Sequence, residues 1–424
     1  MPGASLTSDP RLASAKEPTM RLITQAREGI PNDLTVCVGQ QDAPICGKTD
    51  RALQAGLDYL ARLGGGTLKI GPGIYTMRNS IHLQSRIRIV GAGDDTVLRK
   101  GPSARTKLVE DSDWYYQSVK VESPETFEIG DGIVLQAKPP NSNFQCRRFT
   151  ITGIDGQTLF LEKQLVDNFW IDQEASCASL FPIICGEEVT DIEIRDLVIE
   201  GNREENENIN GNYAAGIFMQ NCDRINIDSI AVQNYNGDGI SWQIVHDLSV
   251  TNSRSINNAG LGLHPGSGSQ RPQMRGNQIE RCHLGIFFCW GVKHGIAEQN
   301  QISDCDIGVS IGHRDTDNIV RENIINGCSK HGLLFRNESH DRNGHRNGHR
   351  NRIEKNQFLD CGTLEDGCVI HISGPTDDIT FKDNQFSETR EGAKVKAIVA
   401  AAETNGLVLE GNQYSGLEAP DDHD

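Results

Sequence analysis

Three stretches decide the fold: NQIERCHLGI at residues 277–286, NQISDCDIGV at 300–309 and NIINGCSKHGL at 323–333. Each begins with Asn, has Cys five residues later and reaches Gly eight or nine residues after the Asn. Their starts are 23 residues apart. Because a unit of this length without a ten-residue helical stripe cannot bury its apolar side alone, it indicates a solenoid of stacked coils, each built from short strands.

The same pattern extends in both directions along the chain. Glycines that precede a short apolar strand occur at Gly216, Gly239, Gly262, Gly285, Gly308, Gly332 and Gly367. The Asn positions are Asn277, Asn300, Asn323, Asn356, Asn384 and Asn412, and the Cys positions are Cys282, Cys305, Cys328 and Cys361. We expect stacked Asn side chains to bond to the turn of the adjacent coil and stacked Cys to fill a thin core.

The N-terminal half contains two further elements. Residues 49–61 place Leu53, Leu57 and Leu60 on one helical stripe, and a helix there would close the open end of a solenoid. Alternating apolar residues at 128–135 and 149–161 predict a small β insertion. The predicted organisation is a flexible N-terminal segment (1–35), a cap helix with the first coils (36–100), a β-rich insertion (101–187) and the main coils (188–424).

Composition limits the class of protein. The net charge of −17 argues against nucleic-acid binding, which needs a basic surface. No run of about 18 apolar residues predicts a membrane span, and residues 1–21 lack the apolar core of a signal peptide. As written, the chain is therefore expected in the cytoplasm, and a truncated start would leave a secreted or periplasmic protein open. Pairing of Cys37 with Cys46 and of Cys177 with Cys185 also stays open.

The stretch TDRALQAGLDYLARLGGGTLKIGPGIY at 49–75, together with the Asn ladder, resembles the pectate-lyase-like superfamily. The likeness covers about residues 45–415. It implies an all-β, right-handed parallel β-helix with an N-terminal capping helix and a small β insertion. It also implies a carbohydrate-active protein, since that superfamily includes lyases, hydrolases, epimerases, fructotransferases and phage tailspikes. Some members are trimers, so a homotrimer is left open.

One subfamily pattern is incomplete. Residues 236–239, NGDG, are similar to the first motif of polygalacturonases. The next coil of those enzymes carries paired aspartates, but here it reads GLGLH at 260–264. This departure argues against inverting polygalacturonase chemistry.

The candidate catalytic residues are those that strand alternation and short turns place outside the core. His264 lies among small residues and can act as a base near neutral pH. Asp238 is either a catalytic carboxylate or a turn residue before Gly239. His313 and Asp315 would supply a proton carrier and an orienting carboxylate, although the same residues can simply build a turn. Lys293 is a second candidate base.

The remaining candidates would hold a sugar. Cations could neutralise a uronate carboxylate, aromatic rings could stack on sugars, and a loop acid could lean over the groove. These substrate-binding candidates are Arg314, Arg336, Trp290, Gln243, Phe287, His294 and Glu207. His340, His345 and His349 match no known ligand spacing, so neither a metal nor a cofactor is predicted.

We therefore expect a polysaccharide-active enzyme with a shallow groove along one face of the solenoid. The favoured reaction is β-elimination in a uronic-acid polymer, catalysed by a polysaccharide lyase. The first alternative is a glycoside hydrolase or a glycosyl (fructo)transferase that uses Asp238 with Asp315 or a loop Glu. The second is a noncatalytic glycan-binding or tailspike-like protein. The expected partner is a polysaccharide or oligosaccharide, without nucleic acid or membrane.

Overall fold

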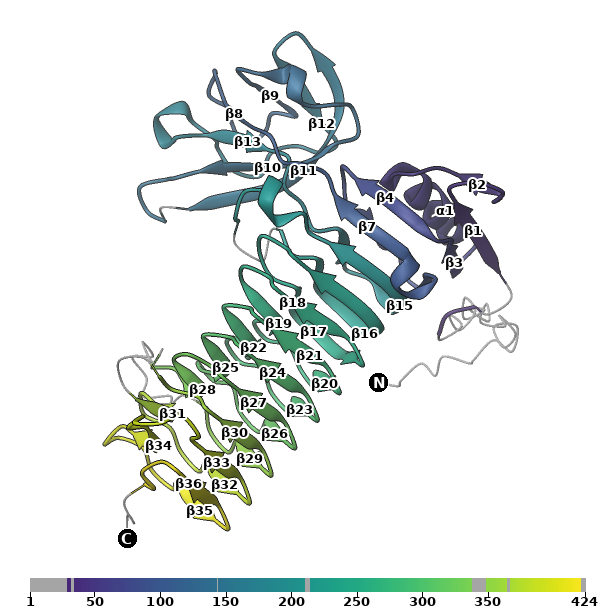
Figure 1. The fold of residues 1–424 in the computed structure, drawn as a ribbon. Coiled ribbons are helices and arrows are strands. Elements are labelled where there is room, and N and C mark those ends of the chain that lie inside the picture. Colours follow the sequence, from purple (N-terminus) through teal and green to yellow (C-terminus); the bar gives the residue numbers. More distant parts are fainter. Residues whose placement is uncertain are drawn as a thin grey trace, which may run out of the picture.

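The computed structural model describes residues 29–31, 34–142, 144–209, 214–337, 348–363 and 367–420. Figure 1 shows a tapering stack of coils, a β-rich lobe beside its first part, and one α-helix at the N-terminal end. Nearly every solenoid strand pairs in parallel with the equivalent strand of the next coil, as Leu284 with Ile307 and Ile302 with Ile325 do. The predicted parallel β-helix is therefore present.

Three ladders of parallel strands form the walls of the solenoid. The first contains β5 (Ile81–His82), β14 (Ile184–Glu187), the start of β16 (Ile217–Gln233), the start of β17 (Ile240–Thr251), β19 (Leu261–Pro265), β22 (Leu284–Phe287), β25 (Ile307–Ile311), β28 (His331–Phe335), β31 (Cys368–Ile372) and β34 (Lys396–Ala400). We call its outward surface the β19 face. Because each coil adds one strand to it, residues far apart in sequence meet there.

The other two ladders complete each coil. The second contains β1 (Thr35–Gly39), β3 (Gly66–Ile70), β6 (Ile87–Val90), the first part of β15 (Thr190–Glu200), the middle of β16, the end of β17, β20 (Gln273–Arg275), β23 (Ile296–Glu298), β26 (Ile319–Arg321), β29 (Arg352–Glu354), β32 (Thr380–Lys382) and β35 (Val408–Glu410). The third contains β4 (Gly73–Met77), β7 (Thr96–Lys100), the end of β15, the end of β16, β18 (Arg254–Ile256), β21 (Gln278–Glu280), β24 (Gln301–Ser303), β27 (Ile324–Asn326), β30 (Gln357–Leu359), β33 (Gln385–Ser387) and β36 (Gln413–Ser415). Strand β2 (Ile45–Cys46) pairs with β1 at the N-terminal end.

The Asn ladder makes the predicted contacts. The Nδ2 groups of Asn277, Asn300 and Asn323 each donate to a main-chain carbonyl oxygen at 2.9 Å. The Oδ1 atoms of Asn300 and Asn323 accept the main-chain N–H of the preceding ladder Asn at 3.0 and 2.9 Å. Because these amides are buried, the bonds satisfy both the Asn side chains and main-chain groups that have no access to water.

The Cys ladder fills the core, as predicted. Cys282, Cys305, Cys328 and Cys361 are buried free thiols, and burial raises the pKa of Cys282 to about 11. Cys37, Cys46, Cys177 and Cys185 are also free thiols, so the two open pairings do not form. Trp242, which by strand parity points inward, is fully buried in the same core.

Helix α1 (Asp50–Arg62) closes the N-terminal end. Its buried stripe is Leu53, Leu57 and Leu60, as the periodicity predicts, and these side chains join the core of the first coils. The helix thereby removes apolar surface that the first coil would otherwise expose. Within the described ranges, no helix is both long and apolar enough to span a bilayer.

The β-rich lobe leaves the solenoid after β7. It is a six-stranded antiparallel sheet with a core of its own, and it contains β8 (Arg105–Lys107), β9 (Ser118–Lys120), β10 (Gly132–Ala137), β11 (Gln145–Asp155), β12 (Thr158–Leu161) and β13 (Ser176–Ala178). The solenoid resumes earlier than the predicted boundary at residue 187. Strand β14 pairs with β5 and β16, because Ile184 continues the inward apolar column of Ile81 and Ile217.

Candidate functional site

The β19 face carries one continuous column of outward side chains. Strand register aligns His82, Cys185, Phe218, Ser241, His264, Phe287, Ser310, Leu334 and His371, one from each successive coil. Register pairs Phe287 with Ser310 directly, and the contact between the His264 and Phe287 rings closes the step between those two coils. The predicted column from Phe218 to Leu334 is thus formed, and it extends further in both directions. Because coils are about 4.8 Å apart, neighbouring members can contact one ligand.

An Asp–His pair lies in the middle of this column. The Nδ1 atom of His264 is 2.8 Å from Oδ2 of Asp238 and 3.1 Å from Oγ of Ser241. The other oxygen of Asp238 accepts the main-chain N–H of Leu261 at 2.9 Å. An aspartate in this position orients the imidazole and stabilises its protonated form. Since Ser241 approaches the same ring nitrogen as Asp238, the three do not form a serine-nucleophile triad, which needs the hydroxyl at Nε2.

The second ring nitrogen of His264 has an unusual environment. His264 is only 6 % exposed, and its Nε2 is buried without a hydrogen-bond partner among the described residues. A buried polar atom without a partner costs about 1–3 kcal/mol, so it requires an explanation. The sequence predicted an open groove at His264. The groove is closed at this point, because the ring of Phe287 packs edge-on against the imidazole, with 5.2 Å between the ring centroids.

Arg336 reaches the same cluster from three coils beyond His264. Its guanidinium lies 4.1 Å from the ring centroid of Phe287, so that ring contacts both Arg336 and His264. The guanidinium donates to Oγ of Ser310 at 2.7 Å and to the Phe288 carbonyl at 2.9 Å. These bonds hold the cation against the ring of Phe287.

Asp315 supports Arg336 instead of facing a ligand. Its carboxylate is fully buried and lies 3.7 Å from the guanidinium. It also accepts the main-chain N–H groups of Val292 and Gly312, each at 2.8 Å. With its oxygens engaged in a turn, Asp315 is a positioning residue, and its predicted use as a catalytic carboxylate is not supported by this geometry.

A second group forms where the turns follow β22 and β25. The rings of Trp290 and His313 lie 5.6 Å apart, and Nε of Arg314 donates to Nε2 of His313 at 2.8 Å. Trp290 is more than half exposed, so one side of its ring is open to a ligand. The structure therefore joins three of the predicted site residues in an exposed aromatic and cationic group.

The remaining predicted residues lie apart from these two clusters. Oε1 of Gln243 accepts the N–H of Ser267 at 2.7 Å and so shapes a turn. Lys293 and His294 are exposed in the turn after β22. Glu207 forms an ion pair of 2.6 Å with Arg105 of the β-rich lobe, so it faces that lobe instead of the Asp–His pair.

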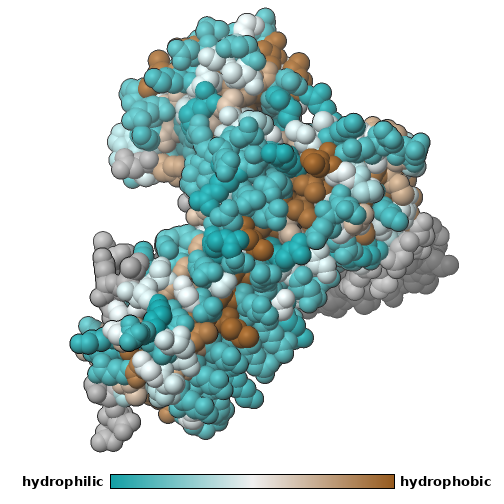
Figure 2. Space-filling view, in the orientation of Figure 1, coloured by the Kyte–Doolittle hydropathy of each residue, from teal (hydrophilic) through white to brown (hydrophobic). Residues whose placement is uncertain are grey.

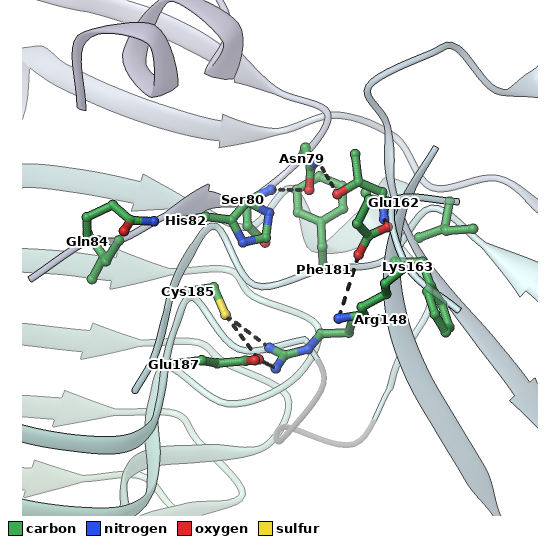
Figure 3. A pocket seen from close by; sticks show the side chains of 15 residues that line it. Asn79, Ser80, His82, Gln84, Arg148, Glu162, Lys163, Phe181, Cys185 and Glu187 are labelled. Carbon is green, nitrogen blue, oxygen red and sulfur yellow. Dashed lines mark hydrogen bonds and ion pairs between the residues drawn. The ribbon is translucent and has the colours of Figure 1, made fainter. Parts of the chain in front are cut away.

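A cavity that was not predicted from the sequence lies between the β-rich lobe and the first coils. Its volume is about 370 Å³, and Figure 3 shows polar side chains entering it from both sides. His82, Cys185 and Glu187 come from the solenoid, whereas Arg148, Glu162 and Lys163 come from the lobe. The sequence signal that could have located this cavity is the column of outward residues, because its register, extended back from His264 through Phe218 and Cys185, reaches His82.

Charges of both signs meet in this cavity. Arg148 contacts a carboxylate oxygen of Glu187, donates to Sγ of Cys185 at 3.3 Å and lies over the ring of Phe218 at 4.7 Å. The side chain of His82 is exposed at the mouth, but surrounding protein atoms and the charge of Arg148 lower the pKa of its imidazole. His82 is therefore neutral near pH 7 and can accept a proton or hydrogen bond there.

Comparison with known proteins supports the fold. A family described as "Right handed beta helix region" matches residues 215–386, which confirms the predicted handedness and solenoid. No curated protein sequence gives a significant match. A solved glycoside hydrolase is 11 % identical with a TM-score of 0.53, over 89 % of this chain and 96 % of that one. The A-module of mannuronan C-5 epimerase AlgE6 from Azotobacter vinelandii is 13 % identical with a TM-score of 0.51, over 88 % and 96 %.

Proposed function

We propose that this protein is a carbohydrate-active enzyme, a lyase that cleaves a uronic-acid polysaccharide by β-elimination on the β19 face. The observation that carries the proposal is the imidazole of His264, which Asp238 holds at Nδ1 while Nε2 is buried without a partner among the described residues. An oriented base with a vacant acceptor atom suits proton abstraction. The solved relatives named as a glycoside hydrolase and a mannuronan C-5 epimerase support a carbohydrate substrate for this fold.

The cluster supplies the groups that β-elimination needs. Nε2 of His264 removes the proton at C5 of a uronate unit, and the electron pair forms the C4–C5 double bond as the bond from C4 to the glycosidic oxygen breaks. Asp238 stabilises the imidazolium, which then returns its proton to the departing oxygen. Arg336 would neutralise the C6 carboxylate, whose charge otherwise opposes loss of the C5 proton.

Binding must displace the ring of Phe287. That ring contacts His264 at 5.2 Å and the guanidinium of Arg336 at 4.1 Å, so it occupies the place between base and cation. Because Phe287 is only partly buried, its side chain has solvent on one side into which it can turn. A sugar ring in its place would contact both groups and shield them from water.

The cavity beside the β-rich lobe would bind another sugar unit of the same polysaccharide molecule. It lies four coils from His264, which corresponds to about 19 Å along the column. Arg148 and Lys163 offer cations to a second uronate, and neutral His82 can bond to a sugar hydroxyl. Because Arg148 and Lys163 are paired with Glu187 and Glu162, a bound uronate would have to compete with these carboxylates for the two cations.

The class of product tests this proposal directly. The full-length protein is incubated with polygalacturonate, polymannuronate, polyguluronate and glucuronan, and both ultraviolet absorbance and reducing ends are followed. We expect one polymer to yield reducing ends together with the absorbance of an unsaturated uronide. Reducing ends without that absorbance, or no product from any of these polymers, would reject the lyase assignment.

Hydrolysis is the second candidate, because of one observation in the cavity. Glu162 of the lobe and Glu187 of the solenoid bring two carboxylates to the same space from opposite walls, as Figure 3 shows. Paired carboxylates are the usual requirement of glycosidases. Asp238 and Asp315, the pair expected from the sequence, are less suited because both accept main-chain N–H groups.

A further inference from the structure

Three potential metal ligands meet at the C-terminal part of the β19 face. His331 begins β28, and Cys368 and His371 belong to β31 of the next coil. One ligand atom from each side chain lies within 4.8 Å of the other two. Cys368 is fully buried and His331 is 8 % exposed, so the group is largely removed from water.

The spacing of these atoms suits a tetrahedral ion. Sγ of Cys368 is 3.6 Å from Nδ1 of His331, and the rings of His331 and His371 lie 5.1 Å apart. With zinc–sulfur and zinc–nitrogen bonds of about 2.3 and 2.0 Å, a tetrahedral ion places its sulfur and nitrogen ligands about 3.5 Å apart. The cysteine and first histidine already stand at that separation.

We propose that His331, Cys368 and His371 bind one divalent transition-metal ion of the zinc class. A thiolate with two imidazoles is a donor set that Zn²⁺ and Co²⁺ prefer and that Mg²⁺ and Ca²⁺ do not. Three protein ligands leave the fourth position for water or another ligand. The sequence signal of this site is the C-x-x-H spacing at 368–371, whereas the prediction of no metal rested on the His-rich segment at 340–349.

Binding requires a defined movement of protons. Nδ1 of His331 lies 3.1 Å from the carbonyl oxygen of Cys368, to which it donates when it carries hydrogen. Coordination through Nδ1 transfers that hydrogen to Nε2 of the same ring. The thiol of Cys368 loses its proton to the buffer as the metal–sulfur bond forms.

This site shares no residue with the proposed reaction site. His371 and His264 belong to the same column but are four coils apart, or about 19 Å. The ion would join two adjacent coils near the C-terminal end, where it stabilises their stacking. Metal binding and polysaccharide cleavage can therefore fail independently of each other.

Titration of the metal-free full-length chain with Co²⁺ and Zn²⁺ tests the proposal. We expect one ion per chain, a thiolate-to-cobalt charge-transfer band, and a melting temperature that rises with Zn²⁺. Cys368→Ser and His371→Ala should each weaken binding by at least about 100-fold. Because His371 is only partly buried, its variant remains informative even where Cys368→Ser folds poorly.

Two control variants separate this site from other binding. Cys305→Ser alters a ladder thiol in another coil, and His340→Ala with His345→Ala alters two of the three histidines at 340–349, so neither should change affinity. Binding without the sulfur band, or binding that survives both Cys368→Ser and His371→Ala, would overturn the proposal. Loss of binding only in the double His variant would do so as well.

Discussion

At the residue scale, the proposed chemistry depends on one nitrogen atom. Nε2 of His264 is buried and unpartnered within the described part of the chain, while Nδ1 is held by Asp238 at 2.8 Å. The repeat spacing was enough to predict that His264, Phe287 and Arg336 share one surface. It did not predict the closed arrangement, since strand parity says which side chains point outward but not which outward side chain packs over its neighbour.

Removal of the covering ring should expose this nitrogen. In Phe287→Ala we expect His264 to react with diethylpyrocarbonate markedly faster than in the unmodified protein, because no other ring packs against the imidazole in the described structure. Mass spectrometry of the modified peptide measures the rate, and the exposed His283 serves as the internal reference. An unchanged rate for His264 would show that Phe287 is not its cover.

At the element scale, the Asn ladder fixes one coil upon the next. Asn323 donates to the Ala297 carbonyl and to Oδ1 of Asn356, both at 2.9 Å, and its own Oδ1 accepts the main-chain N–H of Asn300. The ladder was predictable because it repeats with the coil. The end of the β-rich lobe was not predictable, since the sequence of β14, a strand that is apolar on both faces, fits a lobe and a solenoid equally well.

Loss of one ladder amide should be costly. Asn323→Ala leaves buried main-chain groups without partners, so we expect a loss of about 2–4 kcal/mol in the free energy of unfolding, measured by urea denaturation. Asn326→Ala, in the following strand β27 and partly exposed, should change it by less than about 0.5 kcal/mol. Equal effects of the two substitutions would contradict the role given to the ladder.

A buried lysine marks the junction of solenoid and lobe. The Nζ of Lys100 donates to the carbonyls of Gly101 and Ser179, each at 3.0 Å, and lies 4.3 Å from the ring centroid of Phe181. Burial lowers its pKa from 10.5 to about 7. The unfolded chain therefore holds more protons than the folded chain between pH 7 and 10.5, and stability rises with pH across that window.

Replacement of this lysine should remove that dependence. Relative to Lys100→Met, the wild-type protein should gain on the order of a few kcal/mol as pH rises from about 7 to 10. Urea denaturation at several pH values measures the difference. A difference that stays constant over this range, or shrinks with pH, would contradict the lowered pKa.

At the scale of the whole molecule, stacking of the coils forms one long surface, the β19 face. The cavity at His82, the Asp–His pair and the cluster at His331 all lie on the β19 face. Figure 2 shows, in one view, a mostly hydrophilic exterior with hydrophobic residues gathered in a run along its middle. The homotrimer suggested by the resemblance stays a prediction, which light scattering of the purified protein would test.

The cavity shows what a repeat cannot predict. His82 and Glu187 follow the solenoid register, but Arg148 and Glu162 come from a lobe that has no counterpart in the other coils. Its placement depends on contacts such as the ion pair between Arg78 and Asp131, at 2.6 Å. Contacts of this kind do not repeat from coil to coil, so a periodic sequence pattern cannot predict them.

The rate of unsaturated-uronide formation by His264→Asn tests the central claim most directly. Asparagine keeps an N–H donor for Asp238 but has no atom in place of Nε2, so the fold should persist while the rate falls by about 10²- to 10⁴-fold. His283→Asn is the matched control, because His283 pairs with Asp306 at 2.8 Å in the same way but lies off the column. The account predicts loss of activity in the first variant and full activity in the second. Full activity in a folded His264→Asn protein would contradict it.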